Sequence, residues 1–207
     1  MLAPPRTRLT ASKVDAIFAI LGVATILAVV ISSQALGSQA GEALTRNTVR
    51  LALAWYAVSL LVMLRLAPDD WAMQTLRGRV ARWCWTVGCI SFIVHVAIAF
   101  HFYHDWSHAH AFERTREESG IGEGIYLSYA FTGLWIADVA WWWARPRQYA
   151  ARSSWIDRSL HAFMLFMVFN SMVVFETGAT RWAGLLMFAV LSAAWLLARG
   201  WPRRGRV

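Results

Sequence analysis

The sequence has few cysteines and few charged residues, and each shortage excludes a class of protein. Only two of the 207 residues are cysteines, Cys84 and Cys89. Because they lie five residues apart on one predicted helix, they point in different directions, so we expect neither a disulfide nor a C-x-x-C redox pair. Charged residues make up 15% of the chain and hydrophobic residues 58%. This balance excludes an ordinary soluble domain.

Signatures of several common enzyme classes are also missing. The sequence contains no phosphate-binding nucleotide loop, no hydrolase nucleophile elbow, no H-E-x-x-H zinc-protease motif and no sustained heptad repeat. The segments between the apolar runs are too short to hold a separate catalytic domain. Any chemistry must therefore come from side chains within or beside those runs.

The apolar residues come in long blocks. A hydrocarbon core about 30 Å thick is crossed by a helix of roughly 20 apolar residues. Six segments meet this test: Val14–Ser33, Thr48–Ala67, Cys84–Tyr103, Ile125–Trp143, Ile156–Thr177 and Trp182–Ala198. We therefore predict an all-α integral membrane protein, with a bundle of six transmembrane helices in residues 14–199 between tails at 1–13 and 200–207. The first run is too long for the core of a signal peptide.

The basic residues predict the orientation of this bundle. Fifteen of the twenty lie on one side, in the two tails and in the connections after the second and fourth segments. The positive-inside rule puts this side in the cytoplasm, with both termini, as expected for a multi-pass protein of a bacterial inner membrane. The net charge of +8 then reflects topology. We predict the lipid bilayer as a partner and no binding of nucleic acid.

Three histidines, His101, His104 and His108, fall in the stretch HFYHDWSH at the outer end of the third segment. No glycine or proline occurs between residues 89 and 119, so we predict that the third helix continues outward as an amphipathic rod. On such a helix the three histidines would share one face within roughly 60° of arc, with Asp105 at its edge.

A metal site is one interpretation of this stripe, because imidazole is the commonest metal ligand in proteins. His101 and His108 would be about 10.5 Å apart along the axis, so His104 with His108 is the better pair. Glu176, at the outer end of the fifth segment, has the depth to supply an oxygen ligand. Asp105 could orient an imidazole N–H from behind. This donor set suits zinc, copper or non-haem iron.

Two other interpretations of the histidines stay open. Haem is less favoured within the membrane, because His95 and His161 would differ in depth by roughly 9 Å; a haem held by a stripe histidine near the outer face remains an alternative. The histidines could instead be partly exposed polar residues that form hydrogen bonds or sense pH.

A second polar feature is a buried acid, Asp138, in the fourth segment. His161, in the fifth segment, lies at a matched depth of roughly 7 to 8 Å from the cytoplasmic edge. Consecutive helices with a short connection are usually neighbours, so we predict that Asp138 and His161 form a buried pair. Arg145 and Arg158 are alternative partners for the carboxylate.

Two functions of different classes follow. The first is metal-dependent redox or oxygenation chemistry at an outward-facing histidine and carboxylate site. The second is a non-catalytic subunit or scaffold of a membrane complex, which docks a partner through residues 101–124, including the longest outer loop at about 104–124. A transporter is less favoured, because the sequence shows neither internal repeats nor broken helices near the midplane.

Overall fold

The computed structural model describes residues 11–72 and 75–200, with side chains described up to residue 198. Over these residues the regular elements are all helical, which confirms the all-α prediction. In chain order they are α1 (Ala11–Gln34), η1 (Gly37–Gln39), α2 (Ala40–Met63), α3 (Pro68–Trp71), α4 (Leu76–Tyr103), α5 (His108–Ser119), α6 (Gly124–Ala144), α7 (Pro146–Ala150), α8 (Ser154–Phe169), the π-helical turn η2 (Asn170–Val174) and α9 (Gly178–Gly200).

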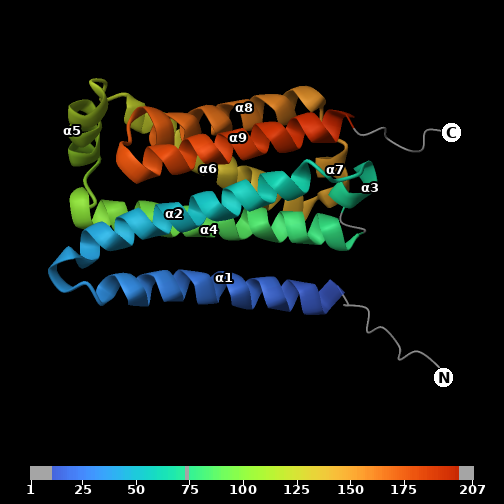
Figure 1. The fold of residues 1–207 in the computed structure, drawn as a ribbon, viewed down its shortest axis with the longest axis horizontal. Helices are drawn as coiled ribbons and strands as arrows, with labels where there is room; N and C mark the ends of the chain where they lie inside the picture. The colour runs from blue at the N-terminus through green and yellow to red at the C-terminus, as the bar shows by residue number, and fades with distance from the viewer. Residues whose placement is uncertain (1–10, 73–74, 201–207) are drawn as a thin grey trace.

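The long helices run side by side along the longest axis of the molecule (Figure 1). α1 begins and α9 ends at the end where the short helices α3 and α7 lie, which we call the α3/α7 end. α5 stands across the opposite end, which we call the α5 end. The histidine-rich segment therefore lies at the opposite end of the bundle from the described arginines of the predicted cytoplasmic side, such as Arg79 and Arg147.

Among the residues that the structure describes, three helices are long and apolar enough to cross a membrane: α1, α4 and residues 178–198 of α9. The predicted fifth segment is less regular than expected. α8 ends at Phe169, and η2 continues the chain to Val174, where the amide of Phe175 donates to the carbonyl of Asn170 at 3.0 Å. This wider turn makes α8 itself only 16 residues long.

The prediction of one unbroken helix from residue 89 to residue 119 is wrong. α4 ends at Tyr103, and Asp105 (φ 47°) and Trp106 (φ 56°) adopt left-handed backbone conformations before α5 begins. The break is held by the Trp106 amide, which donates to the Phe100 carbonyl at 3.1 Å, and by Ser107, which caps α5. A left-handed conformation costs about 1 kcal/mol or more in a residue other than glycine.

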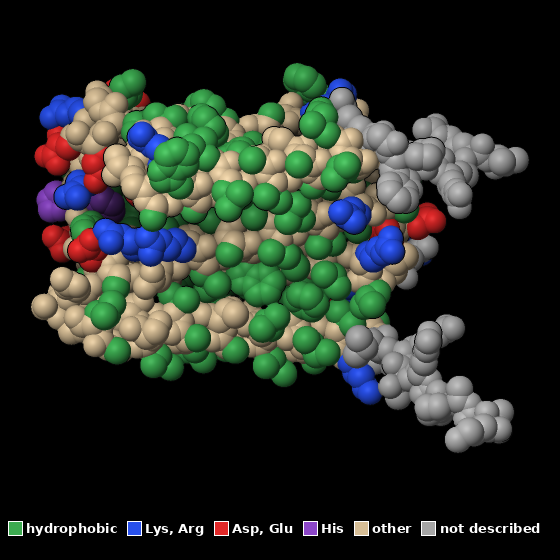
Figure 2. All heavy atoms as spheres, viewed as in Figure 1, with side chains coloured by type: hydrophobic (Ala, Val, Ile, Leu, Met, Phe, Trp, Pro, Cys, Tyr) green, Lys and Arg blue, Asp and Glu red, His purple; other side chains and the backbone are tan. Residues whose placement is uncertain are grey.

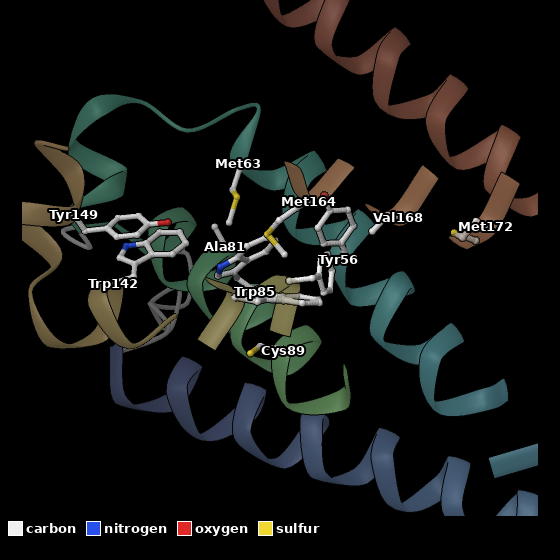
Figure 3. Packing of buried hydrophobic residues seen from close by; sticks show 12 residues of the cluster. Tyr56, Met63, Ala81, Trp85, Cys89, Trp142, Tyr149, Met164, Val168 and Met172 are labelled. Atoms are coloured by element: carbon white, nitrogen blue, oxygen red, sulfur yellow. The ribbon is translucent and has the colours of Figure 1, made fainter. Parts of the chain in front are cut away.

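Aromatic rings fill the centre of the bundle. Trp85 of α4 is fully buried, with ring centroids 5.6 Å from Tyr56 of α2 and 5.0 Å from Trp135 of α6. Figure 3 shows Trp85 close to Tyr56 and Met164, with Trp142 and Tyr149 face to face nearer the α3/α7 end. α4 is the central helix, because it packs against α1, α2 and α6.

Two polar contacts join α1 to α4 near the α3/α7 end. Asp15 accepts hydrogen bonds from Arg79 Nη1 at 2.7 Å and from Trp83 Nε1 at 2.8 Å. The carboxylate of α1 thus has two donors on one neighbour, which fixes the register of the two helices.

The turn between α3 and α4 depends on a glycine. A Cβ atom on Gly78 would lie 1.8 Å from the backbone oxygen of Asp70. The Asp70 carboxylate in turn accepts from the Ala67 amide at 2.7 Å and from the Thr75 hydroxyl. Only glycine lets the first turn of α4 approach this backbone so closely.

We therefore expect Gly78→Ala to lower the free energy of unfolding by about 1–3 kcal/mol, because α3 must shift away from α4. Gly133→Ala on α6 is the matched control, since a Cβ atom there meets nothing within 4 Å. The control should be neutral or slightly stabilising, because alanine favours helix. Thermal unfolding in detergent compares them, and equal midpoints would refute the close approach.

Candidate functional site

The break between α4 and α5 separates the predicted histidine stripe. His101 lies in the last turn of α4, exposed, with its ring 4.8 Å from that of Phe102. His104 follows the end of α4, and the centroid of its ring lies 5.1 Å from that of Phe100. His108 starts α5, where its Nδ1 lies 3.0 Å from the Tyr129 hydroxyl of α6. The three imidazoles therefore contact different aromatic neighbours instead of converging.

The carboxylates assigned to the stripe lie elsewhere as well. Asp105 Oδ2 is 3.9 Å from Nδ1 of His110, and both side chains are largely exposed. Glu176 is exposed, in the turn between η2 and α9, where its backbone oxygen accepts from Arg181 Nε at 2.8 Å. Within the described ranges, no group of three or more His, Cys, Asp and Glu side chains could hold a metal ion. The geometry thus gives the zinc, copper or iron hypothesis no support.

His104 is the stripe residue with the most constrained environment. Its Nδ1 is buried and has no hydrogen-bond partner in the described part of the chain. Burial lowers the pKa of His104, and the positive charge of Arg114 adds to this effect. The neutral imidazole is therefore favoured where α4 meets α5.

α5 is held against the bundle by one narrow face. Ala111 is fully buried, and the ring of Phe112 lies where a Cβ atom on Gly122 would be. The exposed side chains of α5 form ion pairs within the helix, Arg114 with Glu118 at 2.7 Å and Arg116 with Glu113 at 2.5 Å. α5 therefore presents a charged surface at the end of the molecule.

His95, the histidine predicted near mid-membrane, is bonded to the neighbouring helix. Its Nδ1 lies 2.9 Å from the backbone oxygen of Thr45 in α2. A carbonyl oxygen only accepts, so Nδ1 carries the proton in this contact. The ring thereby links α4 to α2.

Asp138 is the best-satisfied buried charge in the described structure, but its partners differ from the prediction. Oδ2 accepts from Trp85 Nε1 and from the Tyr149 hydroxyl, both at 2.9 Å, and Oδ1 accepts from Arg152 Nη1 at 2.6 Å. The side chains of Asp138 and Arg152 are each only 4% exposed. We call Trp85, Asp138, Tyr149 and Arg152 the carboxylate cluster.

The predicted direct pair of Asp138 with His161 is wrong. His161 packs its ring 5.7 Å from that of Trp85, and its Nε2 is 3.7 Å from Asp157 Oδ1, beyond hydrogen-bond length. Asp157 also binds Arg152. Two nitrogens of the Arg152 guanidinium therefore bridge the carboxylates of Asp138 in α6 and Asp157 in α8.

Burial and neighbouring charges keep Tyr149 and Arg152, two members of the carboxylate cluster, protonated. Burial raises the pKa of Tyr149, and the negative charge of Asp138 raises it further, so the phenol stays a donor. Burial alone would lower the pKa of Arg152, but Tyr149, Asp138 and Asp157 outweigh it and raise the pKa. The three donors therefore hold the Asp138 carboxylate between α4, α6 and the segment that follows α7.

Sequence reasoning missed Trp85, Tyr149 and Arg152. α7 begins with a proline, Pro146, and turns the chain back so that Tyr149 stacks on Trp142 with ring centroids 4.7 Å apart. Arg152 follows directly and lies over the Tyr149 ring at 3.9 Å. The Pro-Arg-Gln-Tyr stretch was the available signal for a helix that brings these groups inward.

Comparison with known proteins found no matching family profile, no similar curated protein and no similar solved structure.

Removing one side of the Asp138–Arg152 pair should cost about 3–5 kcal/mol of unfolding free energy, because it leaves a buried charge unpaired. Asp138→Asn and Arg152→Met should therefore be strongly coupled in a double-mutant cycle. His161→Phe keeps a ring against Trp85, so its coupling to Asp138→Asn should be near zero. Unfolding in detergent measures both cycles. A coupling to His161 as large as that to Arg152 would contradict the observed cluster.

Proposed function

We propose that this protein is a non-catalytic subunit of a membrane complex, with six transmembrane helices in a bacterial inner membrane, and that it binds a partner protein through residues 101–124 on the outer side. Both termini are then cytoplasmic. The observation that carries the proposal is an exposed tryptophan, Trp106, held out from the α5 end by a left-handed backbone.

The flanks of the molecule support placement in a bilayer. Figure 2 shows hydrophobic side chains spread along the flank, while most charged side chains gather at the two ends and the histidines visible in this view lie at the α5 end. Ile20 of α1 and Leu186 of α9 are 69% and 66% exposed. An apolar surface of this extent is costly in water and favourable in lipid. α2, α6 and α8 lie alongside the three apolar helices, which supports the proposal that they supply the other three spans.

The α5 end offers anchors for a protein partner. Trp106 is 65% exposed and Ile121, in the turn after α5, is 63% exposed. Tryptophan is enriched among the residues that dominate binding energy at protein interfaces. Two consecutive left-handed residues at Asp105 and Trp106 are costly, and such strain collects at functional sites. A surface with no role would not need to keep Trp106 in this conformation.

Charge indicates the chemistry of the partner. Residues 104–124 carry five acidic side chains and two arginines. Both arginines are already paired with Glu113 and Glu118, so Asp105, Glu117 and Glu123 are left without an arginine partner among the described residues. The partner surface should therefore combine an apolar pocket for Trp106 with a basic rim.

A photoreactive phenylalanine analogue at Trp106 or Ile121 should give one discrete cross-linked product in the native membrane. The same analogue at Ile20, which is equally exposed on the flank, should not give that product. Glu117→Lys combined with Glu123→Lys should abolish it, because the rim then repels a basic partner. The proposal fails if positions 106 and 121 give no product, or if the product survives charge reversal and also forms from position 20.

A further inference from the structure

A groove of about 530 Å³ opens on the flank between α2 and α9. Its walls include Leu53 and Ala57 of α2, Ala183 and Met187 of α9, and Met172 of η2. All of these residues are apolar. The small side chains of the alanines leave the space between α2 and α9 unfilled. These apolar walls suit a hydrocarbon chain better than a polar ligand.

One charged residue, Arg50, stands in the wall of this groove. Arg50 is exposed, and its only hydrogen bond within the described part of the chain is a marginal one, from Nη1 to Asn47 Oδ1 at 3.4 Å. Arg46, one turn earlier on α2, is by contrast paired with Glu42. A guanidinium carries five N–H donors, so most of those on Arg50 are available to a ligand.

The position of Arg50 on the exposed flank favours an anionic ligand. Thr45 is level with His95 of α4, which is eight residues, or about 12 Å, from the outer end of that membrane-crossing helix. Arg50 starts five residues, or about 7.5 Å, deeper still, and its side chain reaches back to Asn47. An unpaired guanidinium on the lipid-facing flank at this level is costly unless it reaches a phosphate at the membrane surface.

The opposite wall adds a second attraction for an anion. Ala179 and Thr180 line the groove and belong to the first turn of α9, a helix of 23 residues. The first turn of a helix bears the positive end of its dipole. Arg50 and this turn therefore face the same end of an apolar groove.

We propose that the groove binds an anionic phospholipid, with its phosphate at Arg50 and the first turn of α9 and one acyl chain along Leu53, Ala57 and Met187. The ligand class follows from charge complementarity at one end of the groove and apolar walls along the rest. The proposal needs the bilayer but is independent of docking at the α5 end.

Native mass spectrometry of the full chain in detergent tests the site. Dissociation constants are measured for phosphatidylglycerol and for phosphatidylethanolamine with identical acyl chains. The wild-type protein should prefer phosphatidylglycerol. Arg50→Gln should weaken its binding about tenfold, the equivalent of one lost charge-assisted contact, and leave phosphatidylethanolamine unchanged. Arg50→Lys should keep part of the preference.

Two further variants distinguish the contact with the lipid phosphate from the contact with the acyl chain. Ala183→Leu should weaken both lipids, because it fills the apolar part of the groove. Arg46→Gln, which removes a paired arginine on the same helix, should change neither. Thermal unfolding confirms that each variant is folded. Equal losses in Arg50→Gln and Arg46→Gln, or no preference in the wild type, would overturn the proposal. Displacement of the lipid by soluble glycerol phosphate would also overturn it, by pointing to a free phosphoester.

Discussion

The buried carboxylate of Asp138 is the constraint on which the α3/α7 end depends. A negative charge inside an apolar bundle requires donors from every side. These come from α4 through Trp85, from α7 through Tyr149 and from the following turn through Arg152. Meeting that requirement brings α7 back over the end of α6 and draws the start of α8 inward through Asp157. The stacked rings of Trp142 and Tyr149 then close this end of the bundle.

The α5 end is organised in the opposite way. Its polar groups are mostly exposed, its ion pairs lie within α5, and its histidines contact aromatic rings of different helices. Such a surface has little of the convergence that catalysis needs, but it has exposed apolar anchors within a charged rim. The α3/α7 end is filled by buried contacts, whereas the α5 end exposes its polar and apolar side chains. For this reason we favour binding over chemistry at residues 101–124.

The class of fold could be predicted from the sequence, because each long apolar segment overlaps a helix. The candidate site could be predicted only in part. Asp138 was recognisable as a buried acid that needs partners, but the short range from α6 to α8 offered several cations, and the choice of Arg152 depends on how α7 folds back. The continuous helix expected through the histidine stripe is absent for a different reason. Asp105 and Trp106 adopt left-handed conformations that neither residue type signals, so a pattern with no glycine or proline concealed a break.

The orientation of the protein in the membrane tests the proposed binding role of residues 101–124 most directly. The α5 end can meet an outer partner only if it lies outside the cytoplasm. The measurement is the labelling of a single cysteine at Gly120, in a Cys84→Ser, Cys89→Ala background, by a membrane-impermeant maleimide in intact spheroplasts. A cysteine at Gln148, in α7, serves as the opposite control. The account predicts rapid labelling at 120 and labelling at 148 only after the membrane is opened. Protection at 120 with free labelling at 148 would contradict it.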